Sequence, residues 1–90
     1  MAAKPTPDQA ATLALKALGY LVNFEPELSR FMELSGAAPG TLRDRADEPE
    51  FLAAVLDFVL TNEELLVRFC DDTSVDARAI HLARHVLAEP

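Results

Sequence analysis

Two histidines near the C-terminus have the spacing that most resembles a chemical site. His81 and His85 stand four positions apart, so a helix would place both imidazoles on one face, where they could hold a zinc ion. The glutamate that follows the first histidine in zinc-dependent hydrolases is missing, because Leu82 stands there. A third ligand would have to come from Glu89 or from the aspartates at 71–72. We therefore interpret both residues as surface histidines, and keep His-based metal binding as an alternative.

The other reactive side chains do not form a catalytic motif. The acidic pairs fall at helix starts or loop edges, where carboxylates satisfy free backbone N–H groups. No serine lies in a nucleophile elbow, and Gly36 and Gly40 match neither a phosphate loop nor a dinucleotide fingerprint. The single cysteine, Cys70, falls on an apolar helix face, which is typical of a core residue. We expect no enzymatic activity and no cofactor.

Three residues are candidates for contact with a partner protein. Arg30 and Arg68 hold equivalent places on two short predicted helices and point away from their apolar faces. Each also has carboxylates three or four residues away, with which it could pair instead. Phe24 falls at a helix junction and, with the loop at 37–39, is the apolar segment that we expect to be most exposed.

The charge of the chain bears on the class of partner. Fifteen acidic and eight basic residues give a net charge of −7, which repels phosphate backbones and anionic lipids. A helix-turn-helix-like DNA-binding module is a second hypothesis, and it would need Arg43, Arg45, Arg78 and Arg84 on one face. No run approaches the roughly twenty apolar residues of a membrane span. One cysteine allows no internal disulfide, so we expect a cytoplasmic protein.

Apolar residues recur with the period of an α-helix along the whole chain, and no segment alternates as a strand does. We expect an all-α fold, a compact bundle of five to six short helices over residues 7–90, after a flexible tail at residues 1–6. Thr6 with Gln9 and Thr61 with Glu64 match the capping box. The predicted helices span about 7–22, 25–35, 39–46, 49–61, 62–70 and 75–88.

The first and fourth of these helices are apolar around most of their circumference. The fourth leaves only a narrow strip for solvent, formed by Glu50, Ala54, Asp57 and Thr61. Such helices must be mostly buried, so we expect the two to cross at the centre and cover each other. A homodimer stays open as a second way to cover them.

The chain also matches itself when it is shifted by 38 residues. This register pairs Leu18 with Leu56, Tyr20 with Phe58, Leu28 with Leu66, Arg30 with Arg68, and Phe31 with Phe69. Both halves contain the sequence Leu-x-Arg-Phe. We interpret the pattern as two pseudo-symmetric three-helix units, and the alternative is a chance likeness between two leucine-rich segments.

Several blocks together resemble a known family. They are residues 18–21, Arg30-Phe31, residues 41–46, residues 49–58 and Arg68-Phe69-Cys70. The pattern is similar to the short alphaproteobacterial proteins grouped as domain-of-unknown-function family 3572, with Phe51 to Phe58 as its most specific part. The resemblance implies a small bacterial helical protein and carries over no functional residue. We therefore predict a non-enzymatic protein-interaction or adaptor domain, whose partner is an unidentified protein.

Overall fold

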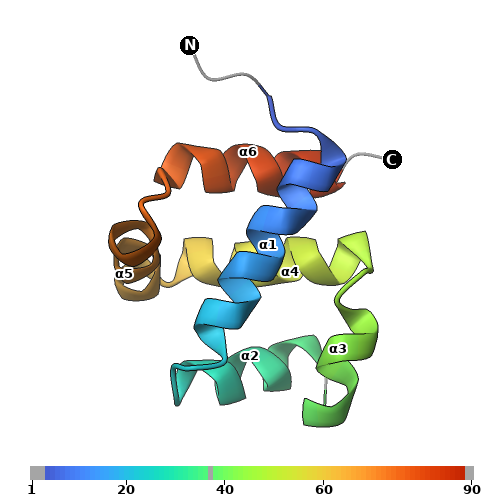
Figure 1. Cartoon of the computed structure of the whole chain (residues 1–90). Coiled ribbons are helices and arrows are strands. Elements are labelled where there is room, and N and C mark those ends of the chain that lie inside the picture. Colours follow the sequence, from blue (N-terminus) through green and yellow to red (C-terminus); the bar gives the residue numbers. More distant parts are fainter. Residues whose placement is uncertain (1–3, 37, 89–90) are drawn as a thin grey trace.

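The computed structural model describes residues 4–36 and 38–88 (Figure 1). Over these residues the chain forms six α-helices and no strand, which confirms the all-α prediction. A single 3-10 turn, Pro39–Thr41, precedes the third helix. The helices are α1 (Pro7–Leu21), α2 (Glu27–Ser35), α3 (Leu42–Arg45), α4 (Pro49–Thr61), α5 (Glu63–Thr73) and α6 (Ala77–Ala88). Residues 1–3 of the predicted tail lie outside the described residues, as does Glu89.

The start of α1 is the predicted capping box. The Gln9 backbone N–H donates to the Thr6 hydroxyl oxygen at 3.1 Å, and the Thr6 N–H donates to the Gln9 side-chain oxygen at 3.0 Å. Thr6 therefore belongs to the helix cap. The predicted cap of α5 was one residue too early, because Asn62 accepts the Leu65 N–H at 3.1 Å. Thr61 ends α4 instead, and its hydroxyl donates to a carbonyl of its own helix.

Two helices end at a residue in the left-handed region. Gly36 follows α2 with a φ of 72°, a conformation that glycine adopts without strain. Ser74 follows α5 with a φ of 57°. The fifth helix was predicted to end at about residue 70, but α5 continues to Thr73, whose hydroxyl donates to the Phe69 carbonyl at 2.6 Å. The last helix begins two residues later than predicted, at Ala77.

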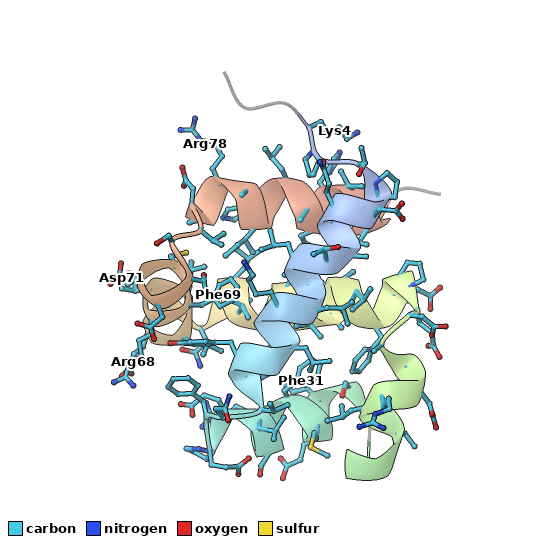
Figure 2. All side chains as sticks on the ribbon, in the orientation of Figure 1. Lys4, Phe31, Arg68, Phe69, Asp71 and Arg78 are labelled. Carbon is cyan, nitrogen blue, oxygen red and sulfur yellow. The ribbon has the colours of Figure 1, made fainter. Side chains whose placement is uncertain are left out.

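The helices form one layer with a helix across it. In Figure 1, α2, α4 and α6 lie beside one another, and α1 crosses in front of α4. The crossing of α1 and α4 confirms the expectation that the two broadly apolar helices cover each other. α6 packs against both of them. Figure 2 shows Phe31 and Phe69 among the side chains of the interior, where both are almost fully buried.

The 38-residue shift is visible in the ring contacts. The rings of Phe31 and Phe58 meet edge to face at 5.5 Å and 64°. Their counterparts, Phe69 and Tyr20, meet at 5.3 Å and 68°. The two left-handed residues, 36 and 74, are also 38 apart. These matches support a duplication of the first two helices of each half.

The third helices do not follow the same symmetry. α3 has four residues and α6 has twelve, so the prediction of two equivalent three-helix units is wrong at this point. Pro49 opens α4 and disfavours helical geometry at Glu48, which is extended with a ψ of 119°, so no helix runs from α3 through this position. The position equivalent to Pro49 in the second half is Leu87, which lets α6 continue.

Candidate functional site

α4 exposes one strip of side chains, and this strip separates two hollows in the surface. Glu50, Asp57 and Thr61 are exposed and Ala54 is half-buried, as the sequence predicted. Both hollows are bordered by Ala54 and Asp57. Their walls come from α2, α4 and α6 together with the residue before α4, and no α1 residue is among those described there. We call Glu50, Ala54, Asp57 and Thr61 the α4 strip.

The larger hollow lies between α4 and α6 and has a volume of about 660 Å³. Its apolar lining consists mainly of small side chains, and its rim is charged. It is lined by Glu48, Pro49, Glu50, Ala53, Ala54, Asp57, Arg84, Leu87 and Ala88. The Arg84 Nε donates to Asp57 Oδ1 at 2.6 Å, which ties α6 to α4. This hydrogen bond raises the pKa of Arg84 above its ordinary value, so the cation stays committed to Asp57.

The smaller hollow lies between α2 and α4 and has a volume of about 230 Å³. Phe31 and Phe58 contribute aromatic surface to its lining, and Leu34 stands at its α2 side. Leu34 is 74% exposed, more than any other large apolar side chain in the described part of the chain. The sequence prediction missed Leu34, because an exposed leucine on a short helix has no distinguishing pattern.

The counterparts of the smaller hollow in the other half of the chain are polar. Shifted by 38 residues, Phe58 corresponds to Tyr20 and Leu34 corresponds to Asp72. The Tyr20 hydroxyl donates to Asp72 Oδ2 at 2.5 Å. One half therefore joins α1 to α5 by a hydrogen bond, whereas the other half leaves a leucine exposed beside a phenylalanine.

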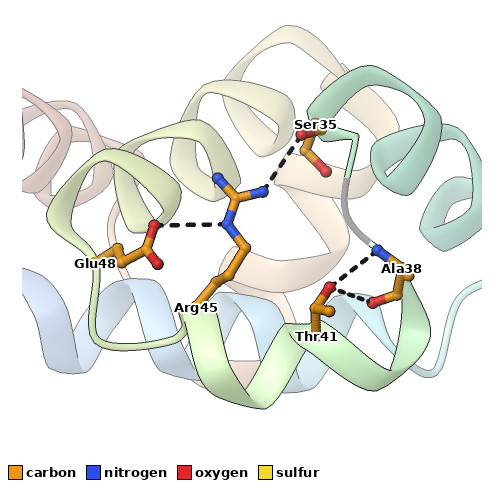
Figure 3. A network of polar contacts seen from close by, with 5 residues as sticks. All are labelled: Ser35, Ala38, Thr41, Arg45 and Glu48. Carbon is orange, nitrogen blue, oxygen red and sulfur yellow. Dashed lines mark hydrogen bonds and ion pairs between the residues drawn. The ribbon is translucent and has the colours of Figure 1, made fainter.

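The α2–α3 connection is held against the start of α4 by Arg45 (Figure 3). Its Nη1 donates to the Ser35 carbonyl at 3.5 Å, and its Nε lies 3.5 Å from a Glu48 carboxylate oxygen. The guanidinium also lies 4.9 Å from the centre of the Phe51 ring. The Thr41 hydroxyl accepts the Ala38 N–H at 3.0 Å and closes the turn between them. Arg45 thereby fixes the end of α2, which forms one wall of the smaller hollow.

The structure brings together two of the three residues predicted to contact a partner. The Phe24 ring lies 4.7 Å from the Tyr20 ring, and the Arg68 guanidinium lies 5.9 Å from the centre of Phe24. Arg68 also pairs with Glu64 at 3.1 Å. Phe24 is half-buried. The prediction that it is the most exposed apolar side chain is wrong, because Tyr20 and Arg68 pack against it.

Arg30 does not share this environment. It is exposed on α2, and no side-chain partner is described for it. The position equivalent to Phe24 in the second half is Asn62, which caps α5 and offers no ring. Arg30 and Arg68 are equivalent in sequence register and differ in their contacts, so they do not form a matched pair for a partner.

The structure places the two histidines on α6 and the cysteine on α5. His81 and His85 are both exposed on α6. Across residues 4–36 and 38–88, no three His, Cys, Asp or Glu side chains lie close enough to hold a metal ion. Burial, with help from nearby carboxylates, raises the pKa of the Cys70 thiol. A protonated thiol is a weak nucleophile.

The arginines of the DNA-binding hypothesis are divided between elements. Arg43 and Arg45 lie on α3 and Arg78 and Arg84 on α6, and these helices lie on opposite sides of α4 (Figure 1). Arg45 and Arg84 are occupied by carboxylates. The four residues of α3 are too few for a recognition helix in a groove. The geometry gives this hypothesis no support.

Comparison with known proteins gives a family. The model of the family described as "Protein of unknown function (DUF3572)" matches residues 7–90. The chain belongs to this family. The match confirms the resemblance noted in the sequence, and the DUF3572 description assigns no activity. No curated protein and no solved structure matches the chain. Among the described helices of this DUF3572 member, none is both long and apolar enough to cross a membrane.

Proposed function

We propose that the chain is a non-enzymatic protein-interaction domain that binds its partner over the α4 strip and the two hollows beside it. The observation that carries the proposal is Leu34, a leucine exposed at the edge of an apolar hollow that adjoins a second hollow across Ala54 and Asp57. Leu34 is continuous with the Phe31 and Phe58 side chains that line this hollow, and contiguous exposed apolar surface is typical of protein contact sites.

The size of the smaller hollow favours a side chain of a protein partner over a whole small molecule. The smaller hollow has a volume of about 230 Å³, below the roughly 300–1,000 Å³ of small-molecule sites. It fits an anchor side chain of a partner, the kind of contact that carries most binding energy at interfaces. Burying a leucine contributes about 1.5–3 kcal/mol, so covering Leu34 favours binding.

The fold does not require a leucine at this position. The equivalent residue in the other half is Asp72, which hydrogen bonds to Tyr20 and leaves its half of the fold intact. An aspartate is therefore tolerated at the corresponding place on α5. This comparison supports a role for Leu34 in contact with another molecule.

The test is a comparison of two glutamine variants. Leu34→Gln removes the exposed leucine at the hollow, and Val67→Gln changes a side chain that is 52% exposed on α5, away from both hollows. Glutamine is a good helix former, so both variants should keep their helical circular dichroism. Each purified protein is used to capture proteins from lysate of the source cell.

We expect one or more proteins to be captured by the unchanged chain and by Val67→Gln, and to be lost with Leu34→Gln. Capture that is equal for all three baits would place the contact elsewhere. A chain that captures nothing above background would count against an interaction domain.

A further inference from the structure

The side chains of the α4 strip limit the kind of partner that can bind there. We propose that the strip and its two hollows receive a basic amphipathic helix of another protein, and this inference rests on the proposed function. Three observations carry it: the direction of the strip, the charge of its rim, and the self-repulsion that a second copy would meet.

The strip runs along nearly the whole of α4. Its residues from Glu50 to Thr61 follow one another at intervals of three and four positions, which spans about 16 Å at 1.5 Å per residue. Hollows lie on both sides, against α6 and against α2. A ridge between two grooves is the surface on which a second helix packs. The small side chains of Ala53 and Ala54 let such a helix approach closely.

The rim of the larger hollow is acidic. Glu48, Glu50 and Asp57 border it, and Arg84 is the basic residue among those described there, while Glu48 pairs with Arg45 of α3. Arg84 is held by Asp57 at 2.6 Å, and no partner is described for the exposed Glu50 carboxylate. The whole chain carries a net charge of −7. This field attracts lysine and arginine side chains and accelerates encounters with a basic partner.

A second copy of this chain fits the strip poorly. A twofold dimer uses the same surface on both subunits. The strip would then face its own copy and bring the Glu50 carboxylates of two acidic chains into one interface, whereas Asp57 is already paired with Arg84. Like charges brought together in an interface oppose binding, and each copy already carries seven excess negative charges. The charge pattern therefore selects a basic helix over a homodimer.

The probe is a synthetic peptide of about 18 residues, long enough for a helix of about 27 Å. Its leucines lie on one helical face and its lysines on the other. A control peptide has every lysine replaced by glutamate. Each peptide is titrated into the isotope-labelled full chain, and backbone amide shifts are followed by nuclear magnetic resonance.

With the basic peptide, we expect shifts concentrated in residues 50–61 of α4, 31–35 of α2 and 84–88 of α6, and affinity that falls as salt is added. The acidic peptide should leave these residues unchanged. Glu50→Gln should weaken binding about two- to fivefold, the range of an exposed ion pair. Glu63→Gln is the matched control, since both glutamates lie in the first turn of their helix.

Three results would overturn the inference: equal binding of the two peptides, equal weakening by the two glutamine variants, or no binding of the basic peptide at about 1 mM. Concentration-dependent shifts at the strip without peptide would assign the surface to a second copy, and would also overturn it. If capture depends on Leu34 but the basic and acidic peptides bind equally, the proposed interaction domain is retained and the inference of a basic partner is rejected. If capture does not depend on Leu34 either, the proposed function and the inference of a basic partner are both rejected.

Discussion

The ionisation of Tyr20 gives a direct test of the contact between α1 and α5. Tyr20 is the only tyrosine and the chain has no tryptophan, so the ultraviolet absorbance of tyrosinate reports this residue alone. Burial, which contributes most, the hydrogen bond to Asp72 and the charge of that carboxylate together raise its pKa from 10.0 to about 12. Arg68 acts in the opposite direction.

We therefore expect a titration midpoint near pH 12 in the unchanged chain. Asp72→Asn removes the negative charge beside the hydroxyl, so its midpoint should fall between 10 and 12, because burial still raises the pKa. Asp44→Asn on α3 is the matched control and should leave the midpoint unchanged. A midpoint near 10 in the unchanged chain, while circular dichroism still shows folded helices, would refute the contact.

The same shift makes stability depend on pH at the alkaline end. Since the folded chain holds the Tyr20 proton more tightly than the unfolded chain, the stabilisation is fully present below pH 10. It is lost as the pH rises from 10 to about 12. Tyr20 is partly exposed and water screens part of the effect, so we expect Tyr20→Phe to cost about 1 kcal/mol at neutral pH. Urea unfolding should show this difference shrinking above pH 10.

Four other variants test the fold. Gly36→Ala should lower the free energy of unfolding by about 1–2 kcal/mol, because alanine is strained at this positive φ. Ser74→Gly should raise it by up to about 1 kcal/mol, because glycine adopts the same conformation without strain. Urea unfolding measures both changes, and two changes of the same sign would contradict the backbone argument. Phe31→Ala leaves a cavity in the core and should lower the free energy of unfolding, measured in the same way, by about 3–5 kcal/mol. A loss below about 1 kcal/mol would show that Phe31 is not central to core packing. Leu34→Asp combined with Phe58→Tyr should recreate the polar pair of the other half, so a double-mutant cycle should give a favourable coupling of about 1 kcal/mol; zero coupling would reject the equivalence.

Much of the fold could be predicted because helix signals are local. The capping box at Thr6, the proline that opens α4 and the glycine that ends α2 each act within one turn of the chain. The pattern of apolar residues then identified α1 and α4 as the central pair. Errors appeared where a tertiary contact decides the outcome, as at residues 71–72, where Asp72 bonds to Tyr20 on another helix.

Less of the candidate site could be predicted, because the exposure of a side chain depends on which other helices pack beside it. The strip on α4 was identified from the helical wheel, but the hollows on either side of it depend on α2 and α6. Phe24 was expected at the surface and is packed between Tyr20 and Arg68. Tyr20 lies only four residues before Phe24, but Arg68 follows it by 44 residues, so the contact with Arg68 is not visible in the sequence near Phe24.

The comparison of the two halves separates what the fold needs from what it does not. Phe31 and Phe69 occupy equivalent places and both are buried against an aromatic ring of the other half, so the fold requires a phenylalanine-sized side chain at each. Leu34 and Asp72 are also equivalent, yet one is exposed beside a hollow and the other is hydrogen bonded. A position that accepts either residue is not fixed by packing. The cost of leaving a leucine in water at that position is offset only when something covers it, which is the physical reason to look for the partner there.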